Sequence, residues 1–305
     1  MKSCVASLTF AVSLSAFWCV SIAQTQEMPA DYQQVLKTVG KSGDYKANVL
    51  KVNIPRNDIH VTIDKLSLPT AFGFGGWFAM TKGDGGDDVL MGDLVLLQEE
   101  VNPVMSALLD NGLEVTALHN HFFWETPRIY YMHVHGHGKA ADLAQRIKPA
   151  LDLIGKGQPA AAAPGGAANA NTKSSLDTTQ IAKIVGHEGE PSGAVYKITL
   201  GRDDLKLKEM GAIINARMGL NTWAAFYGTN EDAAVAGDVA MLESEVTPTL
   251  KALRSNGIDV VAIHHHMIGT QPAIIFLHYW GRGPADKLAM GFKAALDQLG
   301  KGGQQ

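Results

Sequence analysis

Cysteine is nearly absent from this 305-residue chain, which has only Cys4 and Cys19. Both lie in segment 1–23, where Lys2 precedes an apolar stretch and small residues stand at positions 21 and 23. This pattern is typical of a signal peptide, so we expect cleavage and a periplasmic or secreted mature protein. The mature chain would contain no cysteine, which excludes disulfides, thiolate ligands and a cysteine nucleophile.

Other signals are missing as well. The net charge of -4 gives no basic footprint for nucleic acid. No second apolar run is long enough to span a bilayer, so we expect no integral membrane segment after signal cleavage. The sequence also lacks a nucleophile elbow, a zinc-protease helix motif and a phosphate-loop lysine motif. The common motif-defined enzyme classes are therefore not indicated.

An internal repeat is the strongest positive feature. Residues 92–138 align without a gap to residues 237–283, and 19 of these 47 positions are identical. Upstream the offset grows from 145 to 146, so that Trp77 matches Trp223. Agreement of this length indicates a duplication. It predicts a first domain at 27–156 and a second at 176–302, joined by an Ala/Gly/Pro-rich linker at 157–175.

The two copies together predict an α+β fold, each repeat forming a mainly antiparallel sheet with two helices packed on one face. Proline in a first helical turn and Asn-Gly at the end predict helices at 99–110 and 244–255. Amphipathic patterns predict final helices at 140–154 and 285–299. Strands are expected around 49–63, 77–81 and 89–97, at the matching positions of the second copy, and in a pair before each final helix.

Histidines recur on that last strand pair. His119 and His121 share one face of a strand, as do His264 and His266, because strand side chains alternate. A regular hairpin would place His119 opposite His133, and His264 opposite His278, about 5 Å apart at Cβ. The sequence thus predicts three imidazoles gathered within each repeat, on the face opposite an apolar one.

Neutral imidazole is a ligand for zinc, copper, nickel or iron, and three histidines with an open position suit a catalytic zinc ion. We therefore expect a divalent metal ion, with zinc preferred. A carboxylate could complete the site or act as base. Glu100 and Glu245 match at helix starts and are the predicted catalytic pair, while Asp93 and Asp238 match in a Gly-Asp pair. The predicted metal ligands are His119, His121, His133, His135, His264, His266 and His278.

The copies differ around these histidines. His135 and His137 of the first copy correspond to Trp280 and Arg282 of the second. The first copy is richer in histidine and is predicted to be the better metal site. The alternative is that the histidines are ordinary hydrogen-bonding groups.

Several motifs together resemble the LppY/LpqO family: Gly92-Asp93, Glu100 to Pro103, Ala117 to His121, Pro127-Arg128 and His133 to Gly138. The resemblance covers nearly all of both repeats, although copy two departs from it at His265, Trp280 and Arg282. It implies an exported bacterial domain of unknown function present as two tandem copies. It supplies no reaction.

Three functions remain open from the residues. The first is an exported metal-binding protein, in its sharpest form a zinc-dependent hydrolase acting on an envelope or extracellular substrate. The second is a non-catalytic protein that sequesters metal or binds an unidentified small-molecule or envelope ligand in a cleft between repeats. The third is a structural interaction module. The sequence does not decide whether the protein is an enzyme.

Overall fold

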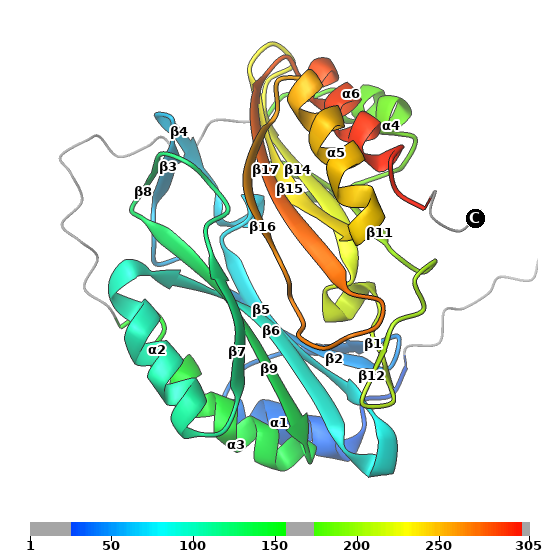
Figure 1. Ribbon diagram of the computed structural model, residues 1–305. Helices are drawn as coiled ribbons and strands as arrows, with labels where there is room; N and C mark the ends of the chain where they lie inside the picture. Colours follow the sequence, from blue (N-terminus) through cyan, green and yellow to red (C-terminus); the bar gives the residue numbers. More distant parts are fainter. Residues whose placement is uncertain (1–25, 157–173, 301–305) are drawn as a thin grey trace, which may run out of the picture.

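The computed structural model describes residues 26–156 and 174–300, which form two domains of the same architecture (Figure 1). Each domain has a six-stranded antiparallel sheet with helices on its outer face. The predicted α+β fold with two tandem copies is confirmed. The predicted signal peptide and most of the predicted linker lie outside the described residues. No described helix has the length and apolar character needed to cross a membrane.

The sheet of the first repeat has the strand order β1-β2-β5-β6-β9-β7, so the last strand pair of the sequence lies at one edge. Successive side chains along its strands point alternately to the helix-covered face and to the face toward the second repeat. Their bounds are Asp44–Lys46 (β1), Val49–Pro55 (β2), Gly75–Lys82 (β5), Asp88–Leu97 (β6), Glu114–His119 (β7) and Ile129–Gly138 (β9).

The second repeat builds the same sheet in the order β10-β11-β14-β15-β17-β16. The matching order follows from the aligned hydrophobic and turn patterns of the two copies. Its strands are Glu190–Ser192 (β10), Val195–Gly201 (β11), Asn221–Gly228 (β14), Ala233–Leu242 (β15), Asp259–His264 (β16) and Ile274–Gly283 (β17).

Three helices cover each sheet, one more than predicted. The additional helix is the first of each repeat, α1 and α4, whose buried residues are few because each is short. Gly112, with φ 70°, takes the left-handed conformation after the second helix, as its Asn-Gly pair predicts. The helices are Ala30–Val39 (α1), Gln98–Asp110 (α2), Ala140–Leu151 (α3), Thr178–Val185 (α4), Glu243–Ser255 (α5) and Ala285–Leu296 (α6).

The two repeats pack through the sheet faces that the helices leave free. Each repeat extends an arm, residues 59–74 or 205–220, onto the sheet of the other. The arm of the first repeat contributes Phe72 to a core shared with Trp280. The arm of the second contributes Leu220 to a core shared with Val49 and Met91. Because these shared cores contain buried residues from both repeats, the two domains form one packed unit.

The arms carry small pairings of their own. In the first repeat β3 (Val61–Ile63) lies between β4 (Leu66–Leu68) and β8 (Glu125–Thr126). In the second repeat β12 (Lys208–Glu209) pairs with β13 (Ala212–Ile213). The first pairing joins the arm of the first repeat to β8 of the same repeat, and the second lies within the arm of the second repeat.

Candidate metal site between the repeats

Six buried or half-buried histidines lie together where the two sheets face each other, and we call them the imidazole cluster. They form three ring-to-ring pairs across the domain boundary, two stacked and one, His119–His264, tilted. Ring centroids are 3.7 Å apart for His119–His264, 3.5 Å for His121–His278 and 3.8 Å for His133–His266. The cluster consists of His119, His121, His133, His264, His266 and His278.

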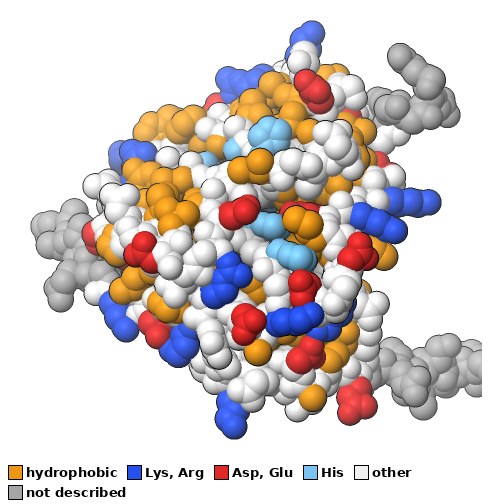
Figure 2. All heavy atoms as spheres, turned by 60° about the horizontal axis from the view of Figure 1, so that its bottom comes forward, with side chains coloured by type: hydrophobic (Ala, Val, Ile, Leu, Met, Phe, Trp, Pro, Cys, Tyr) orange, Lys and Arg blue, Asp and Glu red, His pale blue; other side chains and the backbone are white. Residues whose placement is uncertain are grey.

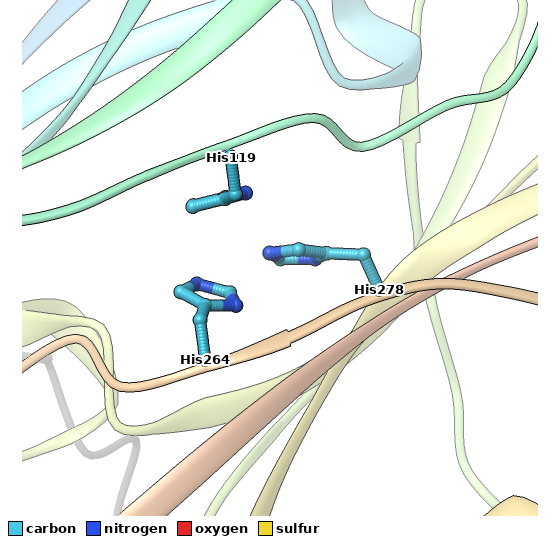
Figure 3. A group of neighbouring side chains, drawn as sticks. All are labelled: His119, His264 and His278. Carbon is cyan, nitrogen blue, oxygen red and sulfur yellow. The ribbon is translucent and has the colours of Figure 1, made fainter.

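This arrangement corrects the predicted one. The sequence predicted one three-histidine site in each repeat, whereas every all-histidine group with ligand atoms within 4.8 Å of one another mixes the repeats. One such group is His119, His264 and His278, whose rings point into a common space in Figure 3. The other is His133, His264 and His266. The predicted residues do meet, but as one shared cluster.

The strand register explains part of the difference. His119 lies opposite Tyr131, and Ala117 lies opposite His133, because β7 has an irregularity between Val115 and Ala117. The predicted pairing of His119 with His133 is therefore wrong by two residues. The connection between β7 and β9 is also longer than a tight hairpin loop, since it includes β8. His119 and His133 are diagonal neighbours instead, with ring centroids 5.0 Å apart.

Several imidazole nitrogens have a lone pair free for a ligand. Nδ1 of His278 lies 3.4 Å from the carbonyl oxygen of Gly237, and Nδ1 of His119 lies 3.4 Å from that of Asn120. These contacts assign the proton to Nδ1 and leave the Nε2 lone pair available. Neither Nε2 atom has a hydrogen-bond partner among the described residues, and the same holds for Nε2 of His121 and His266.

Burial keeps the cluster neutral. Desolvation lowers the pKa of His119 to about 4, and desolvation together with neighbouring imidazoles lowers that of His264 to about 2. The pKa values of the other four imidazoles also fall well below the ordinary value, for the same first reason. Neutral imidazole is the form that binds metal ions, so the cluster is ready to bind at neutral pH.

Two aspartates complete the donor set. Asp93 has an oxygen within 4.8 Å of ligand nitrogens of His119 and His133, and Asp238 is placed in the same way beside His266 and His278. One oxygen of each aspartate has no hydrogen-bond partner among the described residues. Burial raises the pKa of Asp93 to about 8 and that of Asp238 well above its ordinary value. A nearby cation would favour the ionised form of both.

The predicted catalytic glutamates occupy a different setting. Glu100 accepts hydrogen bonds from the Arg56 guanidinium at 2.6 Å, from the Leu97 amide at 2.8 Å and from the Gly155 amide at 2.7 Å. Glu245 has the equivalent partners, with Arg202 as its cation. Neither glutamate belongs to the groups of neighbouring metal-ligand atoms found in the described chain. Their contacts hold the start of a helix, and their catalytic role stays a prediction.

His135 also lies outside the cluster. Its Nε2 is 2.6 Å from a carboxylate oxygen of Glu209, which reaches it from the arm of the second repeat. His137 is near Asp87, at 3.8 Å. The extra histidines of copy one thus do not make it the richer metal site, because each repeat gives three imidazoles to the cluster. Figure 2 shows histidine side chains on one face of the molecule, with charged side chains of both signs around them.

A cavity of about 620 Å³ opens beside the cluster, between the two repeats. His121, His266, Asp93 and Asp238 contribute to its lining. The cavity was not predicted residue by residue, although the sequence placed a cleft between the repeats as a ligand site. Lys51 and Lys197 line it too, and burial lowers the pKa of each to about 8.

The fold and the shared cluster define a fused two-repeat α+β protein with a histidine-lined domain interface. The chain belongs to the family described as Domain of Unknown Function (DUF1259), whose profile matches residues 33–153 and 179–298. The two matches show the tandem copies directly.

Comparisons with other proteins add little to this assignment. No curated protein matches the sequence. Among solved structures, the trimeric bacterial microcompartment shell protein PduB aligns with 14% identity and a TM-score of 0.21, covering 85% of this chain and 93% of its own. EtuB from Clostridium kluyveri aligns with 10% identity and a TM-score of 0.20, covering 84% of this chain and 90% of its own. TM-scores this low carry no conclusion about fold or function.

Proposed function

We propose that this protein binds a divalent metal ion, zinc by preference, in the imidazole cluster between its two repeats. The observation that carries the proposal is the crowding of six neutral imidazoles and two aspartates, several of whose ligand atoms have no hydrogen-bond partner in the part of the chain that the structure describes. A buried polar atom without a partner costs about 1–3 kcal/mol. A metal ion would turn these unmatched groups into ligands.

Zinc fits this donor set best. Imidazole nitrogen and carboxylate oxygen are its common ligands, usually four around one ion. The imidazole cluster and the two aspartates together offer eight residues, more than one tetrahedral ion uses. The surplus leaves room for an open coordination position or for a second ion.

The cavity favours hydrolysis as a second candidate function. It reaches the cluster at His121 and His266, so a small molecule in it could approach a bound ion. Zinc with an open position lowers the pKa of its bound water to about 7 and polarises carbonyl or phosphoryl groups. Asp93 and Asp238 line both cavity and cluster, so either could accept a proton there. A saturated metal shell would instead favour sequestration or a structural role.

An exported location completes the proposal. The apolar segment at 1–23 and the resemblance to the LppY/LpqO family both support the periplasm or the extracellular space. The ligand would then be an envelope or extracellular small molecule.

Elemental analysis of purified protein tests the metal site. We expect bound zinc in the wild type and its loss in both His119→Ala and His264→Ala, because one shared cluster needs ligands from both repeats. Two independent sites would lose only part of the metal in each variant. His187→Ala, which changes an exposed histidine, is the matched control. Wild-type protein that binds no zinc, copper, nickel or iron would overturn the proposal.

X-ray absorption at the zinc edge separates the candidate functions. An exchangeable oxygen ligand beside protein nitrogens and oxygens would support catalysis. A shell filled by protein atoms alone would exclude the hydrolase and leave metal binding in place.

A further inference from the structure

Two lysine–tryptophan pairs face the interdomain cavity, one from each repeat. Nζ of Lys51 lies 4.2 Å from the ring centroid of Trp77, and Nζ of Lys197 lies 3.9 Å from that of Trp223. All four residues line the cavity. Lys51 and Lys197 occupy equivalent positions on β2 and β11, so the duplication places two ammonium groups around one space.

No direct ion pair or hydrogen bond of Lys51 or Lys197 occurs among the described residues. Asp93 acts on Lys51 and Asp238 acts on Lys197 only through longer-range electrostatics, and burial favours the neutral form of both carboxylates. The fully buried cations of the protein do have direct anionic partners, as Arg56 has Glu100 and Arg202 has Glu245. A tryptophan face offsets only part of the cost of removing an ammonium group from water. The two lysines of the cavity therefore lack a hydrogen-bonded counterion among the described residues, and a bound anion could supply one.

The metal ion increases this imbalance. A divalent ion and two lysines exceed the charge of Asp93 and Asp238 by two, even when both carboxylates are ionised. Arg217 also lines the cavity, but its charge is offset by Asp44. The positive surplus lies beside the cluster, where an anion could contact both the lysines and the ion.

We propose that the interdomain cavity binds a small molecule carrying an oxyanion, a carboxylate or a phosphate, between Lys51 and Lys197. As a ligand class for the proposed metal site, this inference rests on the proposed function. The oxyanion neutralises both ammonium groups by charge-assisted hydrogen bonds. The volume of about 620 Å³ is within the range of small-molecule sites. The tryptophan pair flanks the ligand and sets the lysine positions.

Isothermal titration calorimetry of the zinc-loaded full chain tests this inference with three probes. Inorganic phosphate and benzoate represent the two oxyanion classes, and benzamide is the uncharged counterpart of benzoate. We expect at least one anion to bind and benzamide not to bind. Lys51→Met and Lys197→Met should each weaken anion binding roughly tenfold, since each removes one charged hydrogen bond. Lys46→Met, which changes an exposed lysine on β1, should have no effect.

Thermal unfolding provides a second readout that does not depend on calorimetry. Without anion, Lys51→Met/Lys197→Met should melt at or above the wild-type temperature, because methionine removes two half-buried charges that lack a direct ion pair. Phosphate or benzoate should raise the melting temperature of the wild type and leave that of the double variant unchanged. A folded double variant that binds the anions as tightly as the wild type overturns the inference.

The two proposals fail separately. Zinc binding without binding of either anion overturns this inference and leaves the metal site standing. Wild-type protein without metal overturns the metal site. The metal-free chain is then titrated with the same anions. Binding that the lysine variants lose still supports the anion site, and no binding overturns it as well.

Discussion

His135 of the first repeat and Glu209 of the second form an ion pair across the domain interface, with Nε2 and a carboxylate oxygen 2.6 Å apart. When the repeats are exchanged, His135 corresponds to Trp280 of the second repeat and Glu209 corresponds to Ile63 of the first. Trp280 and Ile63 belong to one hydrophobic cluster. The pseudo-symmetric contact is thus polar on one side and apolar on the other. Two sequence differences between the copies, which look unrelated in the alignment, have a common structural reason.

This ion pair should make part of the stability depend on pH. Burial lowers the pKa of His135, but the carboxylates of Glu209 and Glu114 outweigh burial and raise it above the ordinary value of 6.5. A raised folded-state pKa gives stability that is complete below about pH 6.5 and is lost as the pH rises through the folded-state value. Glu209→Gln should cost about 1–2 kcal/mol at pH 6 and less at pH 9, as measured by urea unfolding.

Glu114→Gln is the control for this pair. The Glu114 carboxylate is 3.5 Å from His135, and its side chain is 72% exposed. Its removal should change stability much less. Equal losses for Glu209→Gln at pH 6 and pH 9 would contradict a charged His135.

The imidazole cluster should have the opposite pH dependence in metal-free protein. Its six imidazoles have lowered folded-state pKa values, so the unfolded chain takes up more protons once the pH falls below about 6.5. Asp93 and Asp238 have the opposite effect on stability, because their raised pKa values keep them protonated in the folded state. The six imidazoles outnumber these two carboxyl groups, so their effect dominates. The free energy of unfolding should fall by about 1.4 kcal/mol per pH unit for each excess proton. Urea unfolding of chelator-treated protein between pH 7.5 and pH 4.5 measures this, and a flat profile would contradict buried neutral imidazoles.

Glu100 is expected to stabilise the folded protein. Its side chain is 2% exposed and paired with an equally buried Arg56. Glu100→Gln leaves that guanidinium short of a counterion, so the loss should be about 3–5 kcal/mol. Glu245→Gln should behave alike. Asp58→Asn should cost much less, because the Asp58 side chain is 43% exposed. A Glu100→Gln protein that is as stable as the wild type would contradict this stabilising role.

Gly219 is expected to tolerate alanine poorly. Its φ of 97° is unfavourable for any other residue, and a Cβ there would lie 3.0 Å from the Trp77 ring. Gly73 is the equivalent position, where the Cβ would lie 3.7 Å from Trp223 in ordinary contact. Gly219→Ala should lose about 1–3 kcal/mol in thermal unfolding, with Gly73→Ala close to neutral. Similar melting temperatures for the two variants would contradict this difference.

The sequence predicted the repeat, the fold class and a gathering of three histidines within each repeat, because each depends on local pattern. Apolar spacing and Asn-Gly stops placed helices such as α2 to within a residue. The short helix α1 was missed because few buried residues mark it. The interface was missed for a different reason: contacts such as His121 with His278 join residues 157 positions apart, and strand periodicity says only which side a residue faces. Only one signal in the sequence could have pointed to Glu209. It stands where the first copy has Ile63, just as His135 stands where the second copy has Trp280, and the two changes together suggest a contact.

The contacts between the two repeats explain why the present molecule must be a single chain. His119 packs against its own counterpart, His264, and the other two histidine pairs are interchanged when the repeats are swapped, which is the geometry of an isologous homodimer. Two separate copies of a single-repeat ancestor could have built the same centre. They could not have placed histidine with glutamate on one flank and tryptophan with isoleucine on the other. In a single fused chain, the two contacts on either side of the imidazole cluster can differ in sequence, while the cluster itself keeps the same residues from both repeats.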